Sequence, residues 1–507
     1  MKTFQGEDHK DFLHIFHSVE KESLSEDMKV FWEAQEKALL QTSSKGYRWH
    51  PKVIRLCLSI WNRSPEAYKD LRDSDMLLLP SGRLLRMYKN SCTQDAGFNA
   101  SVGQWIAQEA VKRKIGPEER EGGIILDEMA IQEDLQMKFK LVGLVCLGEE
   151  LNSMQKIVTG KWETIEVATR VLQFVFLGNN GFRFPFVHFP TKEAESASLY
   201  TNFWKAVGWL RMFGFQTNYG CCDGREANRS LIKMHFKGKD PHNMKKLRNN
   251  LEKSRSGGVR LLCFDDKTIE WRHLYQAYKW DQSSNSLKSH ERLTDEHFSL
   301  GYASRMRNHL AEDVLSKKML YLLQAYKRYM SQRRGSEPEH LDGTIAFINM
   351  TSKLIYTFAD IRPISSLDDH RLAMNHEILE YFQKWEMDAQ SHQELSKADC
   401  ARRLLSQKLR FDISSMIIGF QEVCKIAFIR FPGSTISPFR TNSDLVENVF
   451  CQETGNNGQN SNPTYAQYGP TMNSILLRQT TTTSCSNTGS VENLTFFKSG
   501  NLRSNKT

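Results

Sequence analysis

The 507-residue sequence predicts a mixed α/β domain combined with mainly helical regions. Apolar runs at 122–131, 139–147, 167–177 and 215–222 are typical of strands that are covered on both faces. Apolar residues at helical spacing dominate instead before residue 90, from 294 to 332 and from 367 to 429. At about 150 residues per domain, the length corresponds to two to four domains.

The composition is that of a globular protein, with 40% hydrophobic and 25% charged residues, and it excludes wholesale disorder. The sequence has no run of 18 apolar residues, so we expect no membrane-spanning helix and no membrane partner. Met1 to Lys10 is charged and lacks the apolar region of a secretory signal. The ten cysteines include no C-x-x-C pair and no zinc-site spacing, which favours reduced thiols in the nucleus or cytosol.

Residues 12–40 predict a helix with Met28, Phe31, Trp32 and Leu39 on one face. Such a helix either packs into the core or pairs with a helix of a partner.

Residues 47–90 predict three short helices that carry Arg72, Arg83, Arg86 and Lys89. Short helices joined by tight turns with basic residues are typical of a helix-turn-helix module. A plain helical subdomain with a solvated basic face explains the same pattern.

The net charge is +9, and most of the excess lies in one segment. Residues 225–260 hold eleven Lys and Arg against three acids, a local charge of +8. This segment either neutralises phosphates of a nucleic acid or forms a solvated surface.

Two aspartates follow predicted strands. Asp127 comes directly after the apolar Ile124–Leu126, and Asp223 follows the run 215–222 and precedes Gly224. Two strand-end carboxylates can converge on a divalent cation such as Mg²⁺, because hard cations take oxygen ligands. The alternative is that Asp223–Gly224 is an ordinary turn.

A third acidic group lies in residues 444–450. At helical spacing Asp444, Glu447 and Asn448 share one face and can point into a site. A short amphipathic helix with solvated acids has the same pattern.

Taken together, these stretches resemble the P-element type of transposase, including the THAP-domain-containing transposases of animals. The resemblance extends from about residue 47 to 468, and it rests on the collinear order of motifs that are individually weak. These are Leu126–Ile131, Cys222–Gly224 with Asn228–Arg229, Asp240–His242 with Lys245 and Arg248–Asn250, Ile269–Trp271, Leu293–Thr294 with His297, and Asp444, Glu447 and Phe450 with Asn462–Thr464.

The resemblance implies an RNase H-like catalytic core that is interrupted by a large, mostly helical insertion domain and preceded by a helical N-terminal region. The expected boundaries are 1–46 for an N-terminal helix that could mediate dimerisation, 47–118 for the helix-turn-helix-like region, 119–235 and 431–469 for the two parts of the core, and 236–430 for a GTP-binding insertion. Composition alone predicts a disordered polar tail at 470–507.

The resemblance also implies a D, D, E triad of Asp127, Asp223 and Glu447 that binds two Mg²⁺ ions. It places Asp444 near the nucleotide, although the sequence has no G-x-x-x-x-G-K-[ST] motif, so a GTP site here is not a P-loop. The expected function is Mg-dependent cleavage and strand transfer of DNA by a nuclear homo-oligomer. Within the basic segment, the expected DNA contacts are Arg229, Lys245, Lys246 and Arg248.

Full-length members of this family begin with a THAP zinc module that is ligated by three Cys and one His, and no such set occurs here. The chain is therefore interpreted as a truncated copy, a domesticated derivative or a fragment without its DNA-binding part. The alternative function is a domesticated, catalytically inactive protein that binds DNA or other proteins.

Overall fold

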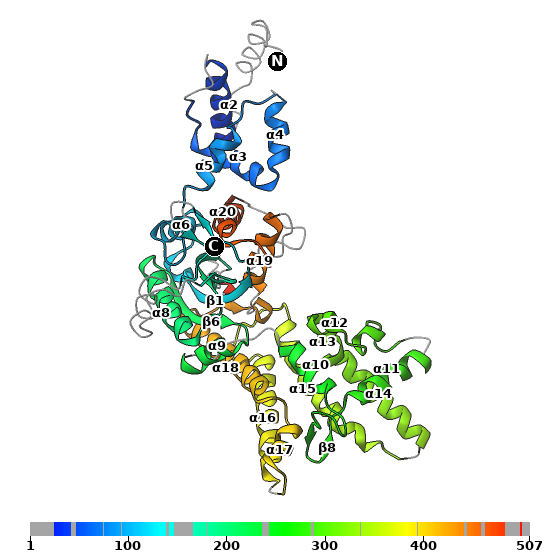
Figure 1. Ribbon diagram of the computed structural model, residues 1–507. Helices are drawn as coiled ribbons and strands as arrows, with labels where there is room; N and C mark the ends of the chain where they lie inside the picture. Colours follow the sequence, from blue (N-terminus) through cyan, green and yellow to red (C-terminus); the bar gives the residue numbers. More distant parts are fainter. Residues whose placement is uncertain are drawn as a thin grey trace, which may run out of the picture.

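The computed structural model describes residues 25–41, 47–74, 76–92, 94–137, 141–146, 166–179, 181–235, 243–284, 288–334, 336–392, 394–440, 444–457, 462–481 and 497–498 (Figure 1). None of the helices in these ranges is both long enough and apolar enough to cross a membrane.

The N-terminal module consists of four helices, α2 (Glu26–Leu39), α3 (Pro51–Arg63), α4 (Pro65–Asp73) and α5 (Gly82–Lys89). Each begins after a residue whose side chain accepts a backbone N–H of the first turn, namely Ser25, His50, Ser64 and Ser81. The helices enclose a small apolar core of their own, which includes Val53, Cys57, Tyr68 and Leu85. The module therefore has a separate core, and in Figure 1 it lies beyond α20 at one end of the molecule.

A four-stranded sheet forms the centre of the molecule. Its strands are β1 (Glu121–Ala130), β4 (Arg170–Gly178), β5 (Arg183–Thr191) and β6 (Gln216–Cys222), in the order β5-β4-β1-β6. The pairs β5–β4 and β4–β1 are antiparallel, whereas β1 and β6 are parallel. Two-stranded pairs are formed by β2 (Gln136–Met137) with β3 (Leu141–Val142), β7 (Cys263–Phe264) with β8 (Lys267–Thr268) and β9 (Thr435–Ile436) with β10 (Phe497–Lys498).

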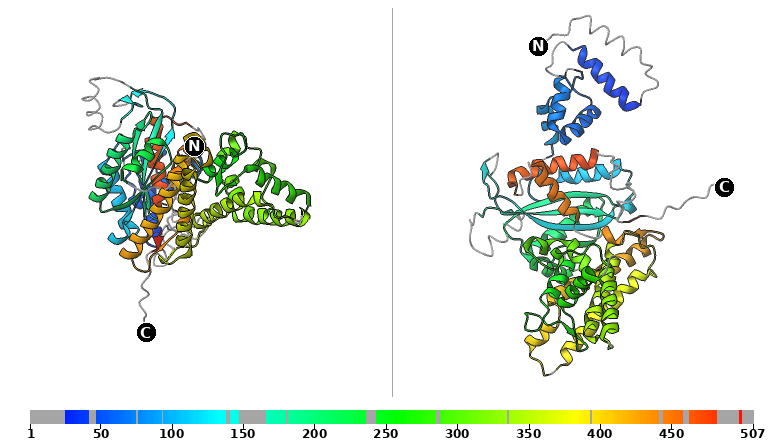
Figure 2. Two further views of the ribbon diagram at one scale, coloured as in Figure 1. Left: turned by 90° about the horizontal axis from the view of Figure 1, so that it is seen from below. Right: turned by 90° about the vertical axis from the view of Figure 1, so that its right-hand side faces the viewer.

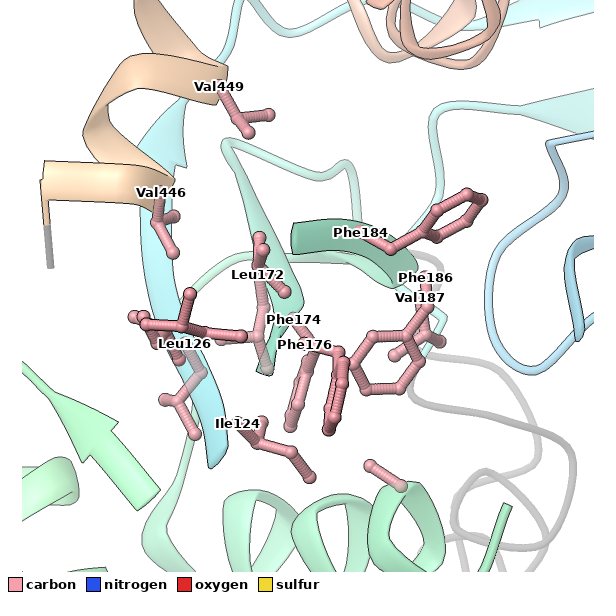
Figure 3. Packing of buried hydrophobic residues seen from close by; sticks show 14 of the residues in the cluster. Ile124, Leu126, Leu172, Phe174, Phe176, Phe184, Phe186, Val187, Val446 and Val449 are labelled. Atoms are coloured by element: carbon pink, nitrogen blue, oxygen red, sulfur yellow. The ribbon is translucent and has the colours of Figure 1, made fainter. Parts of the chain in front are cut away.

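Helices cover both faces of the sheet (Figures 1 and 2). They are α6 (Ala100–Lys112), α8 (Ser196–Met212), α9 (Glu226–His235), α19 (Asp444–Asn456) and α20 (Tyr465–Thr481). Figure 3 shows Val446 and Val449 of α19 directed at Leu126 and Leu172 of the strands, while α8 lies on the other side. Strands buried on both faces explain why the sequence of β4 and β5 is almost continuously apolar.

The insertion between α9 and α19 is helical and has its own core. Its helices are α10 (Asn243–Glu252), α11 (Trp271–Ser284), α12 (Tyr302–Met306), α13 (Asn308–Leu315), α14 (Lys317–Arg334), α15 (Asp342–Ala359), α16 (His370–Ser391), α17 (Lys397–Arg403) and α18 (Gln407–Arg430). Short 3₁₀ helices occur at Pro117–Glu119, Asp295–His297, Glu339–Leu341 and Pro438–Arg440.

A small apolar cluster connects the insertion to the sheet. The second half of α18 contributes Phe420 and Cys424, and the cluster also includes Ile364 and Ile436. Tyr219 of β6 packs against it. The first half of α18, including Ile413, belongs instead to the insertion core. One 24-residue helix is thus shared between the insertion core and the apolar cluster that connects the insertion to the sheet.

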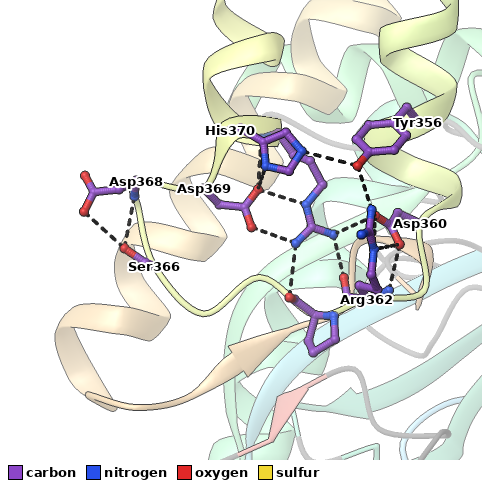
Figure 4. A network of polar contacts seen from close by, with 9 residues as sticks. Tyr356, Asp360, Arg362, Ser366, Asp368, Asp369 and His370 are labelled. Carbon is purple, nitrogen blue, oxygen red and sulfur yellow. Dashed lines mark hydrogen bonds and ion pairs between the residues drawn. The ribbon is translucent and has the colours of Figure 1, made fainter.

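An arginine-centred network fixes the loop between α15 and α16 (Figure 4). The buried Arg371 pairs with Asp369 (Nη2–Oδ2 2.7 Å) and Asp360 (Nη1–Oδ2 3.3 Å), and it donates to the backbone carbonyls of Arg362 and Pro363. This loop pairs with β9 through Ile364, whose N–H and C=O both bond to Ile436 at 2.7 and 2.8 Å. Because β9 leads into α19, the network positions the return of the chain to the core.

Two expected boundaries are wrong. The region 47–118 is not one unit, because Val102, Ile106 and Ala110 of α6 are buried in the same core as the central sheet. The disordered tail does not begin at 470, because α20 continues to Thr481. The polar composition, with its Thr run at 480–483, concealed the apolar side chains of α20, of which Tyr468, Met472, Ile475 and Leu476 are buried. The predicted tail beyond 481 lies outside the described residues, apart from 497–498.

We expect Ile475→Ala to lower the free energy of unfolding by roughly 2–5 kcal/mol, because its fully buried side chain leaves a cavity between α20 and the sheet. Chemical denaturation of the full chain measures this. The matched control is Ile429→Ala, which removes the same atoms from a residue that is 75% exposed on α18. Equal effects of the two substitutions would contradict the burial of α20.

Candidate active site

The parallel pairing of β1 with β6 brings the two aspartates together. Asp223 directly follows β6, whereas Asp127 lies within β1, which continues to Ala130. Leu126 is the register partner of Cys222, and Asp127 and Asp223 are the next residues on the two strands. Neighbouring residues of paired strands project on the same side of a sheet. Asp127 and Asp223 are therefore neighbours, as expected from the sequence, but the expectation that Asp127 follows the end of its strand is wrong, because β1 continues to pair with β4 as far as Ala130.

The third carboxylate comes from α19. Val446 and Val449 are buried against the sheet, whereas Glu447 is exposed on the helix surface between them. Glu447 is nevertheless close enough to Asp127 to act on its charge.

The three acids share one electrostatic environment. Burial, followed by the negative charge of Asp223, raises the pKa of Asp127 from its ordinary 3.8 to about 7, and Glu447 adds a smaller effect in the same direction. The positive charge of Arg225 and the N–H of Glu128, which donates to Asp127 Oδ1 at 2.8 Å, oppose this rise. Close carboxylates with a raised pKa are typical of metal and catalytic sites, because a bound cation removes the repulsion between them.

These oxygens suit Mg²⁺ in chemical type, and Asp127, Asp223 and Glu447 would be its ligands. In the part of the chain that the structure describes, however, no three His, Cys, Asp or Glu residues are gathered closely enough to hold a metal ion. The side-chain amide of Asn228 donates to Asp223 Oδ1 at 2.5 Å, and Arg225 Nε lies 3.2 Å from Asp223 Oδ2. Both oxygens of Asp223 are thus engaged by other residues of the chain.

Sequence reasoning missed two residues of this site, Glu128 and Arg225. Arg225 Nη1 pairs with Glu128 Oε2 at 2.6 Å, and Glu128 Oε1 also accepts from the hydroxyl of Thr191 at 3.0 Å. Glu128 directly follows Asp127 on β1, and successive side chains of a strand point to opposite faces, so the strand pattern gives no sign that Glu128 belongs to the site. The sequence feature that could have identified Arg225 as part of the site is its position two residues after Asp223.

Two of the four expected DNA contacts are wrong. Arg229 is buried and makes a bidentate ion pair with Asp412 of α18 (Nε–Oδ1 2.8 Å and Nη2–Oδ2 2.7 Å), so its charge is neutralised inside the protein. Arg248 is fully buried and donates to the backbone carbonyls of Ser304 and Arg305. Sequence patterns cannot distinguish such internal cations from phosphate-binding ones.

The other two expected DNA contacts are half-buried. Lys246 of α10 lies 2.9 Å from the same Asp412 of α18, so it takes part in an ion pair within the insertion. Lys245 remains a predicted DNA contact. Asp444 is the first residue of α19, and its side chain lies outside the described part of the structure.

The insertion contains a pocket of about 230 Å³ beside β7, with Phe264 and Tyr381 among its walls. Its charged residues are Asp265, Asp342 and Asp388 against one lysine, Lys267. This excess of negative charge does not suit the triphosphate of a nucleotide.

Comparisons with known proteins agree with this architecture. The family model "TNP-like, RNase H N-terminal domain" matches residues 94–235, and "TNP-like, GTP-binding insertion domain" matches residues 241–366. Together they cover more than half of the chain. A comparison with curated proteins gave no match.

Among solved structures, the chain is similar to the Drosophila P element transposase strand transfer complex, with a TM-score of 0.66 and 14% sequence identity. The match covers 89% of this chain and 97% of that one, and at this identity it is a likeness of fold. The predicted fold, an RNase H-like core interrupted by a mostly helical insertion, is confirmed.

We expect Asp127→Asn to stabilise the metal-free protein at neutral pH but not in acid. Because the pKa of Asp127 is raised on folding, wild type loses stability as the pH rises from about 4 to 7, where the unfolded chain ionises before the folded one. The variant should be more stable by roughly 2–4 kcal/mol at pH 8, and the difference should vanish below about pH 4. Denaturant unfolding in EDTA across this range measures it. A difference that does not depend on pH would show that Asp127 titrates normally.

Proposed function

Since this chain belongs to the P-element-type transposase family, we propose that it is a DNA transposase that cleaves and joins DNA at Asp127, Asp223 and Glu447. The observation that carries this proposal is the parallel pairing of β1 with β6, which makes Asp127 and Asp223 neighbours. The negative charges of Asp223 and Glu447 both contribute to the raised pKa of Asp127. The three carboxylates come from β1, from the end of β6 and from α19, and α19 follows the whole insertion in sequence. A plain structural role leaves this repulsive grouping unexplained.

Each residue of the candidate site has its own role in holding a metal ion. Asp127 is oriented by the N–H of Glu128, and Asp223 by Asn228, so each can present a carboxylate oxygen to a metal ion. Two Mg²⁺ ions, when bound, would activate the attacking oxygen and stabilise the leaving oxygen of a phosphodiester. Glu447, exposed on α19, would complete the ligand set.

DNA as the partner is supported by the N-terminal module. Arg83 and Arg86 are exposed on α5, which follows α4 in a helix-turn-helix-like arrangement. α2 exposes Met28 and Leu40 follows it, also exposed, which suits pairing with a second copy in a homo-oligomer. We propose the nucleus as its location, in keeping with DNA as the proposed substrate.

A second candidate function is that of a binding protein without catalysis. It is favoured by the engagement of both Asp223 oxygens and by the absence of an assembled three-residue metal group among the described residues.

We expect Asp127→Ala and Glu447→Gln to lower Mg²⁺-dependent DNA cleavage and joining by about 10²-fold or more, because metal-bound charge stabilisation contributes several kcal/mol to such steps. Nicking of supercoiled plasmid and joining of a labelled oligonucleotide measure the two reactions. Glu380→Gln, an exposed Glu on α16, is the matched control.

Wild-type rates in the first two variants would remove those residues from the mechanism. A wild-type protein that binds DNA without cutting it would establish the binding protein.

We also propose that the insertion binds GTP, which is supported by the name of the family model that matches residues 241–366. Asp444, at the first turn of α19, is the expected contact. We expect Asp444→Asn to weaken binding of fluorescent GTP about tenfold, the effect of losing a hydrogen bond to a charged group. Asp399→Asn, which changes an exposed first-turn acid of α17, should have no effect. Equal affinity for GTP in all three proteins would exclude Asp444 from the site.

A further inference from the structure

We propose that Arg225 is an internal cation that competes with divalent metal for the active-site carboxylates and so sets the metal affinity of this protein. The inference rests on the proposed function, since it concerns the same three-carboxylate site. Arg225 lies two residues after Asp223, in the turn between β6 and α9.

The guanidinium of Arg225 bridges two carboxylates. Its Nη1 lies 2.6 Å from Glu128 Oε2, and its Nε lies 3.2 Å from Asp223 Oδ2. The Glu128 and Asp223 side chains are only 9% and 13% exposed, so both pairs are shielded from water on the acidic side. Partly buried ion pairs of this kind are stronger than surface pairs.

A metal ion on Asp223 Oδ2 would lie next to the guanidinium of Arg225, and the two positive charges repel each other. The guanidinium does not lose its proton in proteins, so it cannot give up the carboxylate by becoming neutral. Movement of the guanidinium away from the carboxylate relieves this repulsion, and its side chain is 42% exposed and therefore has solvent to move into. A dication that enters beside the bound guanidinium meets its full repulsion.

Asp223 has a second set of contacts that does not depend on the guanidinium. Its Oδ1 accepts from the side-chain amide of Asn228 at 2.5 Å and from the backbone N–H of Arg225 at 3.1 Å. When the guanidinium leaves, these two donors still hold the carboxylate, and Oδ2 becomes free for a metal ion. The guanidinium therefore blocks the ligand, while the backbone of the same residue orients it.

Because the guanidinium and the backbone N–H of Arg225 have opposite effects on Asp223 as a metal ligand, the change in metal affinity on removing the guanidinium can be predicted. Arg225→Gln keeps the backbone N–H and removes the charge, so it should bind metal more tightly than wild type. If the guanidinium instead served to position Asp223, the same variant would bind metal more weakly.

The test is a titration of the full chain with Mn²⁺ in the absence of DNA, with free Mn²⁺ followed by electron paramagnetic resonance. We expect Arg225→Gln to lower the Kd about tenfold, and Arg225→Lys, which keeps a charge but cannot bridge both acids, to lower it less. The control is Arg211→Gln, which changes an exposed arginine near the end of α8. Because α8 leads into the start of β6 and Asp223 follows the end of β6, Arg211 lies at the other end of that strand from Asp223. Circular dichroism and thermal melting confirm that each variant is folded.

An unchanged or weaker affinity in folded Arg225→Gln, together with metal binding by wild type that Asp223→Asn abolishes, would overturn the role of Arg225 and leave the proposed function standing. Failure of the proposed function has a different result, in which wild type, Arg225→Gln and Asp223→Asn show the same Mn²⁺ binding.

Discussion

The parallel pairing of β1 with β6 determines where the acidic side chains of this protein lie. It makes Asp127 and Asp223 neighbours although they are 96 residues apart in sequence. A parallel pair needs a long crossover, and here β4, β5 and α8 supply it while extending and covering the sheet. The same pairing brings like charges together at a partly buried edge, and the raised pKa of Asp127 is the electrostatic result.

The return of the chain from the insertion is fixed by charged contacts inside the protein. Arg229 and Lys246 both meet Asp412, and Arg371 holds the loop that pairs with β9. Removing one partner of a buried pair costs about 3–5 kcal/mol, so these contacts are strong constraints on geometry even where their net contribution to stability is small. They explain how α19 can reach the sheet after more than 200 intervening residues.

The sequence allowed Asp127 and Asp223 to be predicted as neighbours, because each directly follows a buried apolar run. It did not show that β1 continues beyond Asp127 to Ala130, because the pairing of that segment with β4 depends on a strand 40 residues later in the chain. It also allowed the split core to be predicted, through the order of weak motifs. It did not allow arginines that bind DNA to be distinguished from arginines that are paired inside the protein. The partners of Arg229 and Arg248 lie 183 and 56–57 residues away in the sequence. The burial of Met472 and Ile475 was hidden for a similar reason, since the surface they cover comes from strands more than 280 residues earlier.

The sharing of α18 has a consequence for the modularity of this fold. At 1.5 Å per residue its 24 residues span about 36 Å, from the interior of the insertion to the cluster beside β6. No boundary within α18 separates the insertion from the sheet, because removal of the insertion would also remove the contacts of Phe420 and Cys424 with Tyr219 and Ile436. The insertion is therefore not an independent domain, and the sheet that it interrupts depends on it for part of its packing.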